Sequence, residues 1–210
     1  MMMFDMRNSQ CLLIYFVCII SIFYSSVTLS VGSFKPTEQE LRLLPPYCKP
    51  KAVNLNATVG PYQKYRPLIP KWKKILGPDY AHLHHYCEAL QYLNKSYLER
   101  DPDKRKFYYS VAISNIEYME RSASKNFVLN PQIAVTKGDI LRKMGNNSAA
   151  ISEYKKAIKY KKNYSSPYAK IFDIYMKLGD KTKAGNALKM GLKYNPNSKM
   201  LKRREKIINK

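Results

Sequence analysis

Residues 138–145 read GDILRKMG, and residues 172–179 read FDIYMKLG. The two stretches end at Gly145 and Gly179, and the residues around these glycines match in step. A glycine after an apolar stretch with helical spacing ends a helix, because it tolerates the left-handed conformation found there. A repeat period of about 34 residues indicates a helix–turn–helix unit, which buries its apolar face only by stacking on a neighbour.

Two consecutive units begin at Pro131 and Ser165, and small or apolar residues fall at matching positions in both. The pattern resembles the tetratricopeptide (TPR) family, which has small residues, a glycine turn, a large ring and a proline at fixed positions. It departs from the family at Phe172, where a small residue is usual, and at Lys162, where proline is usual. The matching residues are Gly138, Gly145, Ala150, Tyr154 and Ala157 in the first unit, and Tyr175, Gly179, Ala184, Gly191 and Pro196 in the second.

The predicted fold is all-α, a short TPR-type helical solenoid with two clear units at 131–196. About three units are normally needed for a stable stack, and residues 78–130 are predicted to add a divergent helical hairpin. Residues 33–77 are predicted to form an extended arm, because eight of the twelve prolines lie between Pro36 and Pro78. A short helix is expected at 36–44, with partial packing on the first helices; a solvated linker is the alternative. Residues 197–210 are predicted to form a basic C-terminal capping helix.

The N-terminal residues 1–32 have the layout of a secretory signal peptide, with Arg7 before an apolar stretch and polar residues after it. No charged residue occurs from Cys11 to Phe34, so an uncleaved anchor at residues 11–32 is the alternative. Residues 76–87 also resemble a segment of uncharacterised exported bacterial TPR proteins, for which no activity is known. We therefore expect an extracytoplasmic protein, either in the bacterial periplasm, secreted, or anchored to the inner membrane.

Two cysteines, Cys48 and Cys87, follow the leader. In an oxidising compartment they are enough for one disulfide, which would fasten the arm to the first helix. The alternative is a buried free thiol at Cys87 and an incidental Cys48.

The chain carries 37 Lys and Arg against 15 Asp and Glu, a formal charge of +22. Such a charge attracts anionic surfaces and polymers, and outside the cytoplasm the candidates are a membrane surface or an acidic polysaccharide rather than nucleic acid. A solvated basic face without a partner is the alternative. The residues expected on this basic surface are Lys155, Lys156, Lys159, Lys189, Lys193, Lys202, Arg203 and Arg204.

In TPR arrays the first helix of each unit lines a concave groove. The resemblance therefore implies groove residues at Gln132, Val135, Asp139, Arg142, Ala169, Asp173 and Met176. Asp139 and Asp173 hold the same position one unit apart, which suggests a groove that receives a polypeptide segment carrying Lys or Arg. Alternatively, each aspartate pairs with a local base, such as Arg142 or Lys143 beside Asp139.

Candidate chemistry is weak elsewhere. His82, His84 and His85 lie near Cys87, but only His84 and Glu88 have the spacing that places two metal ligands on one helix face. Phosphate-binding loops, hydrolase nucleophile motifs and paired zinc-ligand spacings are absent from the sequence. We expect no catalytic residue, metal, cofactor or small-molecule substrate, and predict a non-catalytic protein-binding scaffold or adaptor in the cell envelope. Direct binding of an anionic polymer or lipid is the alternative.

Overall fold

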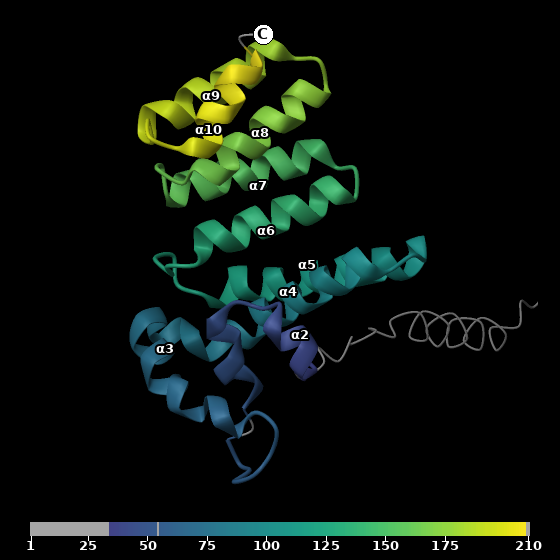
Figure 1. Ribbon diagram of the computed structural model, residues 1–210, viewed down its shortest axis with the longest axis vertical. Coiled ribbons are helices and arrows are strands. Elements are labelled where there is room, and N and C mark those ends of the chain that lie inside the picture. The colour runs from purple at the N-terminus through teal and green to yellow at the C-terminus, as the bar shows by residue number, and fades with distance from the viewer. Residues whose placement is uncertain (1–33, 54, 209–210) are drawn as a thin grey trace, which may run out of the picture. The chain divides into compact units, whose positions relative to one another are not determined.

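The computed structural model describes residues 34–53 and 55–208 (Figure 1). The predicted leader at residues 1–32 lies outside the described residues. Among the described helices, none is both long enough and apolar enough to cross a membrane. The described chain is built of helices and turns, as the predicted all-α class requires.

The arm at 33–77 differs in local structure from the extended chain that its prolines suggest. It contains the helices α2 (Glu38–Arg42) and α3 (Ile69–Leu76) and the 3-10 segments η1 (Pro46–Ala52) and η2 (Gln63–Leu68). Proline fixes φ near the value of a helical first turn, so it interrupts long helices yet fits short helical turns. The expected short helix at 36–44 is present as α2, where Thr37 and Glu40 form a reciprocal N-terminal cap.

The helices α4 (Leu83–Leu98) and α5 (Pro102–Ser122) form a pair at the position of the predicted divergent hairpin, after the 3-10 segment η3 (Gly77–His82). Leu83, Tyr86, Ala112, Ile116 and Met119 of this pair are fully buried in one apolar cluster. The arm packs on α4, and a disulfide joins Cys48 of η1 to Cys87 of α4. The arm and this hairpin therefore share one core.

The two predicted units are the pairs α6 (Asn130–Lys143) with α7 (Asn147–Tyr160), and α8 (Ser165–Lys177) with α9 (Lys181–Tyr194). Gly145 and Gly179 follow α6 and α8 with φ of 84° and 78°, in the left-handed region that glycine adopts without strain. Successive helices pack on one another, so each unit covers the apolar side of the next.

The C-terminal helix α10 (Lys199–Ile208) continues the repeat. It begins one repeat period after Ser165, the start of α8, and packs against both α8 and α9. Leu201 of α10 is fully buried in the same core as Tyr168 and Leu188. The predicted capping helix thus takes the place that the first helix of a further unit would hold.

Equivalent positions in the two units exchange large and small side chains. In the first unit Gly138 faces the ring of Tyr154, and a Cβ on Gly138 would lie 2.5 Å from that ring. In the second unit the same two positions hold Phe172 and Leu188, which are buried in one cluster. The departure at Phe172 is therefore matched by a smaller partner at position 188.

Candidate functional site

The residues predicted to line the concave groove differ widely in exposure. Val135 and Ala169 are buried and belong to the core, and Arg142 is exposed. Gln132, Asp139, Asp173 and Met176 are half-buried. The predicted strip is thus in part a packing surface between units.

Both aspartates of this strip are ion-paired inside the chain. Asp139 lies 2.8 Å from the Lys170 Nζ atom and also accepts a 2.7 Å hydrogen bond from the buried hydroxyl of Tyr154. Asp173 accepts two hydrogen bonds from Arg204, at 2.8 Å from Nε and 2.5 Å from Nη2. The bases are therefore not the sequence neighbours Arg142 or Lys143. Lys170 lies on α8, the first helix of the second unit, and Arg204 lies on α10.

The two ion pairs are repeats of each other. Lys170 and Arg204 are separated by the same interval as Asp139 and Asp173, which is one repeat period. Burial and the hydrogen bond to Asp139 together raise the pKa of the Tyr154 hydroxyl, which stays a donor. The aspartates hold successive helices together, and a ligand cation would have to displace Lys170 or Arg204 to reach them.

Some residues of the predicted basic surface form ion pairs within the chain. Lys156 lies 2.5 Å from Glu120 of α5, and the mostly buried Lys137 of α6 lies 2.8 Å from the same carboxylate. Although burial alone would raise it, hydrogen bonds from these two lysines lower the pKa of Glu120. Lys156 and Arg204 are thus packing residues. The other predicted basic residues are all exposed: Lys155, Lys159, Lys189, Lys193, Lys202 and Arg203.

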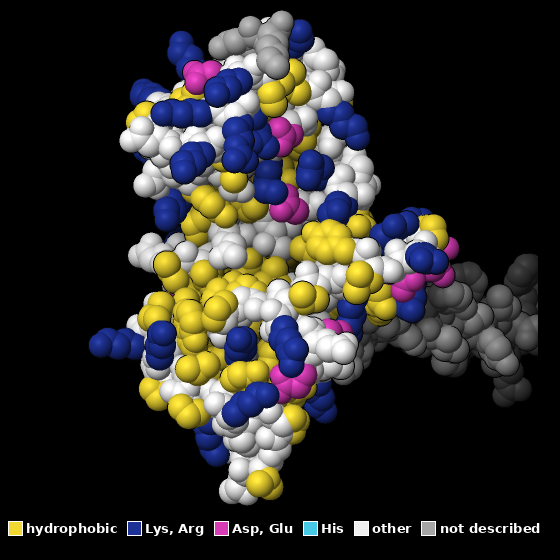
Figure 2. Space-filling model, viewed as in Figure 1, with side chains coloured by type: hydrophobic (Ala, Val, Ile, Leu, Met, Phe, Trp, Pro, Cys, Tyr) yellow, Lys and Arg dark blue, Asp and Glu magenta, His cyan; other side chains and the backbone are white. Residues whose placement is uncertain are grey.

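Figure 2 shows Lys and Arg side chains gathered over the C-terminal helices α9 and α10, with few acidic side chains between them. The sequence explains this distribution, because the basic residues there outnumber the acidic ones far more than in α4 and α5. The net positive charge is therefore greater over the repeat units and α10 than over α4 and α5.

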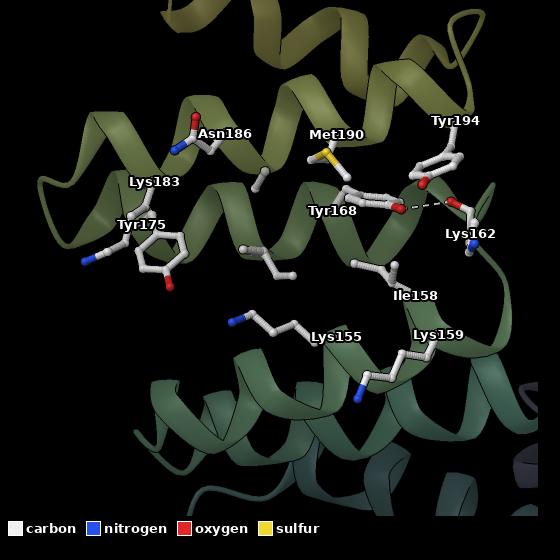
Figure 3. A pocket seen from close by; sticks show the side chains of 12 residues that line it. Lys155, Ile158, Lys159, Lys162, Tyr168, Tyr175, Lys183, Asn186, Met190 and Tyr194 are labelled. Carbon is white, nitrogen blue, oxygen red and sulfur yellow. Dashed lines mark hydrogen bonds between the residues drawn. The ribbon is translucent and has the colours of Figure 1, made fainter.

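A groove of about 580 Å³ lies between α7 and α9, the second helices of the two units, with α8 beneath it (Figure 3). We call it the α7–α9 groove. Side chains of Ile158 from α7, Ile171 and Tyr175 from α8, and Met190 from α9 make its lining largely apolar. At one end Tyr168 stacks on Tyr194, with ring centroids 6.5 Å apart. The groove is thus an apolar hollow built by residues from both units.

Lysines border this apolar hollow. Lys155 and Lys159 lie one turn apart on α7, and Lys162 lies in the turn that follows the end of α7 at Tyr160. Lys183 of α9 also lines the groove, but it is paired with Asp180 at 2.8 Å. Within the described ranges, Lys155, Lys159 and Lys162 form no ion pair, so their charges face solvent uncompensated.

None of the residues predicted to line the concave groove lines the α7–α9 groove. Of the predicted site residues only Lys155 and Lys159 border the α7–α9 groove, whereas Asp139 and Asp173 lie on α6 and α8 and bind neighbouring helices. The lysine spacing and the extra tyrosines at 168 and 194 were readable signals in the sequence. The family resemblance places the groove on the first helix of each unit, so it did not predict a groove bordered by the second helices.

The histidine cluster is packed among aromatic rings. His85 lies 3.7 Å from the Tyr118 ring, centroid to centroid, and its Nδ1 lies 2.8 Å from the amide oxygen of Asn115. Burial lowers the pKa of His84 to about 4, so it is neutral at pH 7. No group of three His, Cys, Asp or Glu residues in the described part of the chain is arranged to hold a metal ion.

Comparison with known proteins agrees with this geometry. The family described as TPR repeat matches residues 138–179, which run from within α6 to the turn after α8. Among solved structures, a thermophilic TPR protein of Thermus thermophilus is similar, with 17% identity and a TM-score of 0.53. That match covers 70% of this chain and 76% of the other. No curated protein sequence matches the chain.

The described chain has the fold of a TPR solenoid, and the TPR repeat family matches it over residues 138–179. This fold suggests a scaffold for protein interactions, and TPR proteins are generally non-catalytic. The partners that the fold implies are other proteins.

Proposed function

We propose that this protein is a non-catalytic scaffold outside the cytoplasm that binds a polypeptide segment. The observation that carries the proposal is the α7–α9 groove, an apolar hollow of about 580 Å³ whose bordering lysines at 155, 159 and 162 have no ion-pair partner among the described residues. Apolar hollows with a few placed polar groups are the usual form of a binding site. The α6 and α8 strip is a weaker candidate, because its aspartates already bind Lys170 and Arg204.

The disulfide supports the extracytoplasmic part of the proposal. Disulfides persist in oxidising compartments and are rare in the cytoplasm, and here one joins the arm to α4. The predicted leader at residues 1–32, as a cleaved signal peptide or as an anchor at 11–32, would deliver the chain to the periplasm, to the inner membrane or to the outside.

Thiol labelling in whole cells tests this location. A variant with Cys11→Ser and Cys18→Ser leaves Cys48 and Cys87 as the only cysteines. We expect a thiol-reactive polymer to shift the protein on a gel only after reduction and denaturation. Equal labelling of both cysteines in unreduced, denatured protein would contradict an oxidising location.

Binding of an anionic lipid or polysaccharide is a second candidate, favoured by the basic residues Lys189, Lys193, Lys202 and Arg203 at the surface of α9 and α10. Exposed charges are screened within a few Å at about 0.5 M salt. Partners that co-purify with the tagged full chain at that salt concentration would favour polypeptide binding. Retention only at low salt, together with binding to vesicles containing phosphatidylglycerol, would favour the second candidate.

A further inference from the structure

We infer that the α7–α9 groove takes an amphipathic polypeptide segment with acidic side chains along one edge and apolar side chains beside them. This inference rests on the proposed function and adds the chemistry of the partner. The groove offers two features together, an apolar lining that includes Ile158 and Met190, and a row of lysines along one border. A partner must satisfy both.

The lysine row sets the acidic edge. Lys155 and Lys159 lie about 6 Å apart along the axis of α7, and Lys162 follows in the turn after the helix. An amphipathic helix with Asp or Glu one turn apart on one face can place carboxylates beside Lys155 and Lys159. Because the three ammonium groups lack ion-pair partners within 34–53 and 55–208, pairing with them breaks no ion pair in that part of the chain.

The apolar lining sets the other edge. Met190 is 46% exposed although it borders the hollow, and the buried Ile171 forms part of its base. Covering exposed apolar surface is favourable by roughly 25 cal/mol per Å². A helix laid in a groove by its apolar face is a common mode of peptide recognition, and here the two second helices provide the walls.

Charge distinguishes this partner from three others. A second copy of the chain carries +22 and would repel the lysine row. Residues 1–33 contain a single acidic residue, Asp5, and cannot supply a row of carboxylates. A single lipid headgroup carries its charge at one point, whereas three separate lysines border the groove. A separate acidic polypeptide fits all of these observations.

Peptide selection on the full chain in mild detergent tests the inference. The probe is a phage-displayed library of random peptides about 16 residues long, which is long enough for a helix to form on binding. Selected peptides are synthesised with a fluorophore, and their affinity is measured by anisotropy at about 0.15 M salt. We expect them to be rich in Asp and Glu at helical spacing, next to Leu, Ile or Phe.

Two matched triple variants locate the binding. Lys155→Glu, Lys159→Glu and Lys162→Glu reverse the groove row, and we expect about tenfold weaker binding or more. Lys189→Glu, Lys193→Glu and Lys202→Glu make the same change in net charge at surface positions that do not line the groove, and we expect a change within about threefold. A single Met190→Glu variant should also weaken binding, because it places a carboxylate in the apolar lining.

The outcomes separate the inference from the function on which it rests. Selected peptides that bind equally well to the groove variants and to the unchanged chain would overturn the inference and leave the scaffold function standing. Equal losses in the two triple variants would reduce the effect to net charge and would also overturn it. A library that yields no binding peptide, while vesicles containing phosphatidylglycerol bind the chain, would overturn both.

Discussion

The two repeat units form the same helical pair, but the side chains at the facing positions of the two helices differ in size between the units. In the first unit Gly138 leaves space for the ring of Tyr154. In the second unit the larger Phe172 takes the position of the glycine, and the smaller Leu188 takes that of the tyrosine. A second exchange occurs nearby, where Ala134 and Ala157 in the first unit correspond to Tyr168 and Gly191 in the second. In both exchanges a larger residue on the first helix of the second unit faces a smaller residue on its second helix, as close packing requires.

We expect the largest loss of stability from Gly138→Val, which removes the space that the first unit provides for Tyr154. Its Cβ would lie 2.5 Å from the Tyr154 ring, which is itself fully buried and cannot swing into solvent. We expect a loss of about 3 kcal/mol in the free energy of unfolding, measured by urea denaturation of the full chain with circular dichroism. Adding Tyr154→Leu, which copies the residue at position 188, should recover part of the loss. If the double variant lost as much stability as the two single variants together, the sizes of residues 138 and 154 would not be coupled, and the interpretation would be wrong.

The next effect is Asp139→Ala. The change leaves the buried Tyr154 hydroxyl without its acceptor and Lys170 without its partner. An unsatisfied buried hydroxyl costs about 1–3 kcal/mol, so we expect a destabilisation near 2 kcal/mol. Adding Tyr154→Phe removes the orphaned hydroxyl and should recover stability. The same unfolding measurement checks both, and no recovery in the double variant would show that the hydroxyl is not the cause.

A smaller effect is expected for Gly191→Ala. The added Cβ would lie 2.8 Å from the Cβ of Tyr168 and 2.9 Å from the Leu201 Cδ1 atom, so the helices must move apart. Overpacking costs typically about 1–3 kcal/mol, but alanine regains about 1 kcal/mol of helix propensity over glycine. The expected net loss is about 1 kcal/mol. Tyr168→Ala, which copies Ala134, should make Gly191→Ala neutral or stabilising; an unchanged penalty would place the clash elsewhere.

The smallest effect is Asp173→Ala, the counterpart of Asp139→Ala. Its pair with Arg204 is partly exposed, with 38% of the Asp173 side chain accessible, and no tyrosine hydroxyl depends on it. Exposed pairs contribute about 0–1 kcal/mol, so a loss below about 1 kcal/mol is expected, vanishing at high salt. Thermal melts at low and high salt provide the measurement. A loss equal to that of Asp139→Ala would show that the two pairs contribute alike.

The sequence predicted the fold of 131–196 well because its signals are local. Gly145 and Gly179 end helices by their own conformational freedom, and both have positive φ as expected. Helix ends that depend on contacts with other segments of the chain were harder to predict. Asn130 resembles a capping residue before Pro131, yet its side-chain amide donates to the carbonyls of Ser124 and Lys125 in the preceding loop. Such contacts depend on the path of the chain before the helix.

The candidate site was less predictable, since it depends on which side chains find partners. The repeat period could have paired Asp139 with Lys170 and Asp173 with Arg204, because the acids and the bases both recur at that interval. Adjacent charges in the sequence pointed instead to Arg142 and Lys143. The α7–α9 groove depends on the distance between two second helices, and no residue pattern within one helix reports that distance.

The bond between Cys48 and Cys87 has a mechanical consequence. It closes a covalent ring over a sequence separation of 39 residues, which includes α3 and the two 3-10 segments before and after it. A pull on the chain ahead of Cys48 would pass through the two sulfur atoms directly to α4, and the intervening segment would carry almost none of the tension. Under oxidising conditions the repeat stack would therefore be loaded at its first long helix, and the segment between Cys48 and Cys87 would not be stretched.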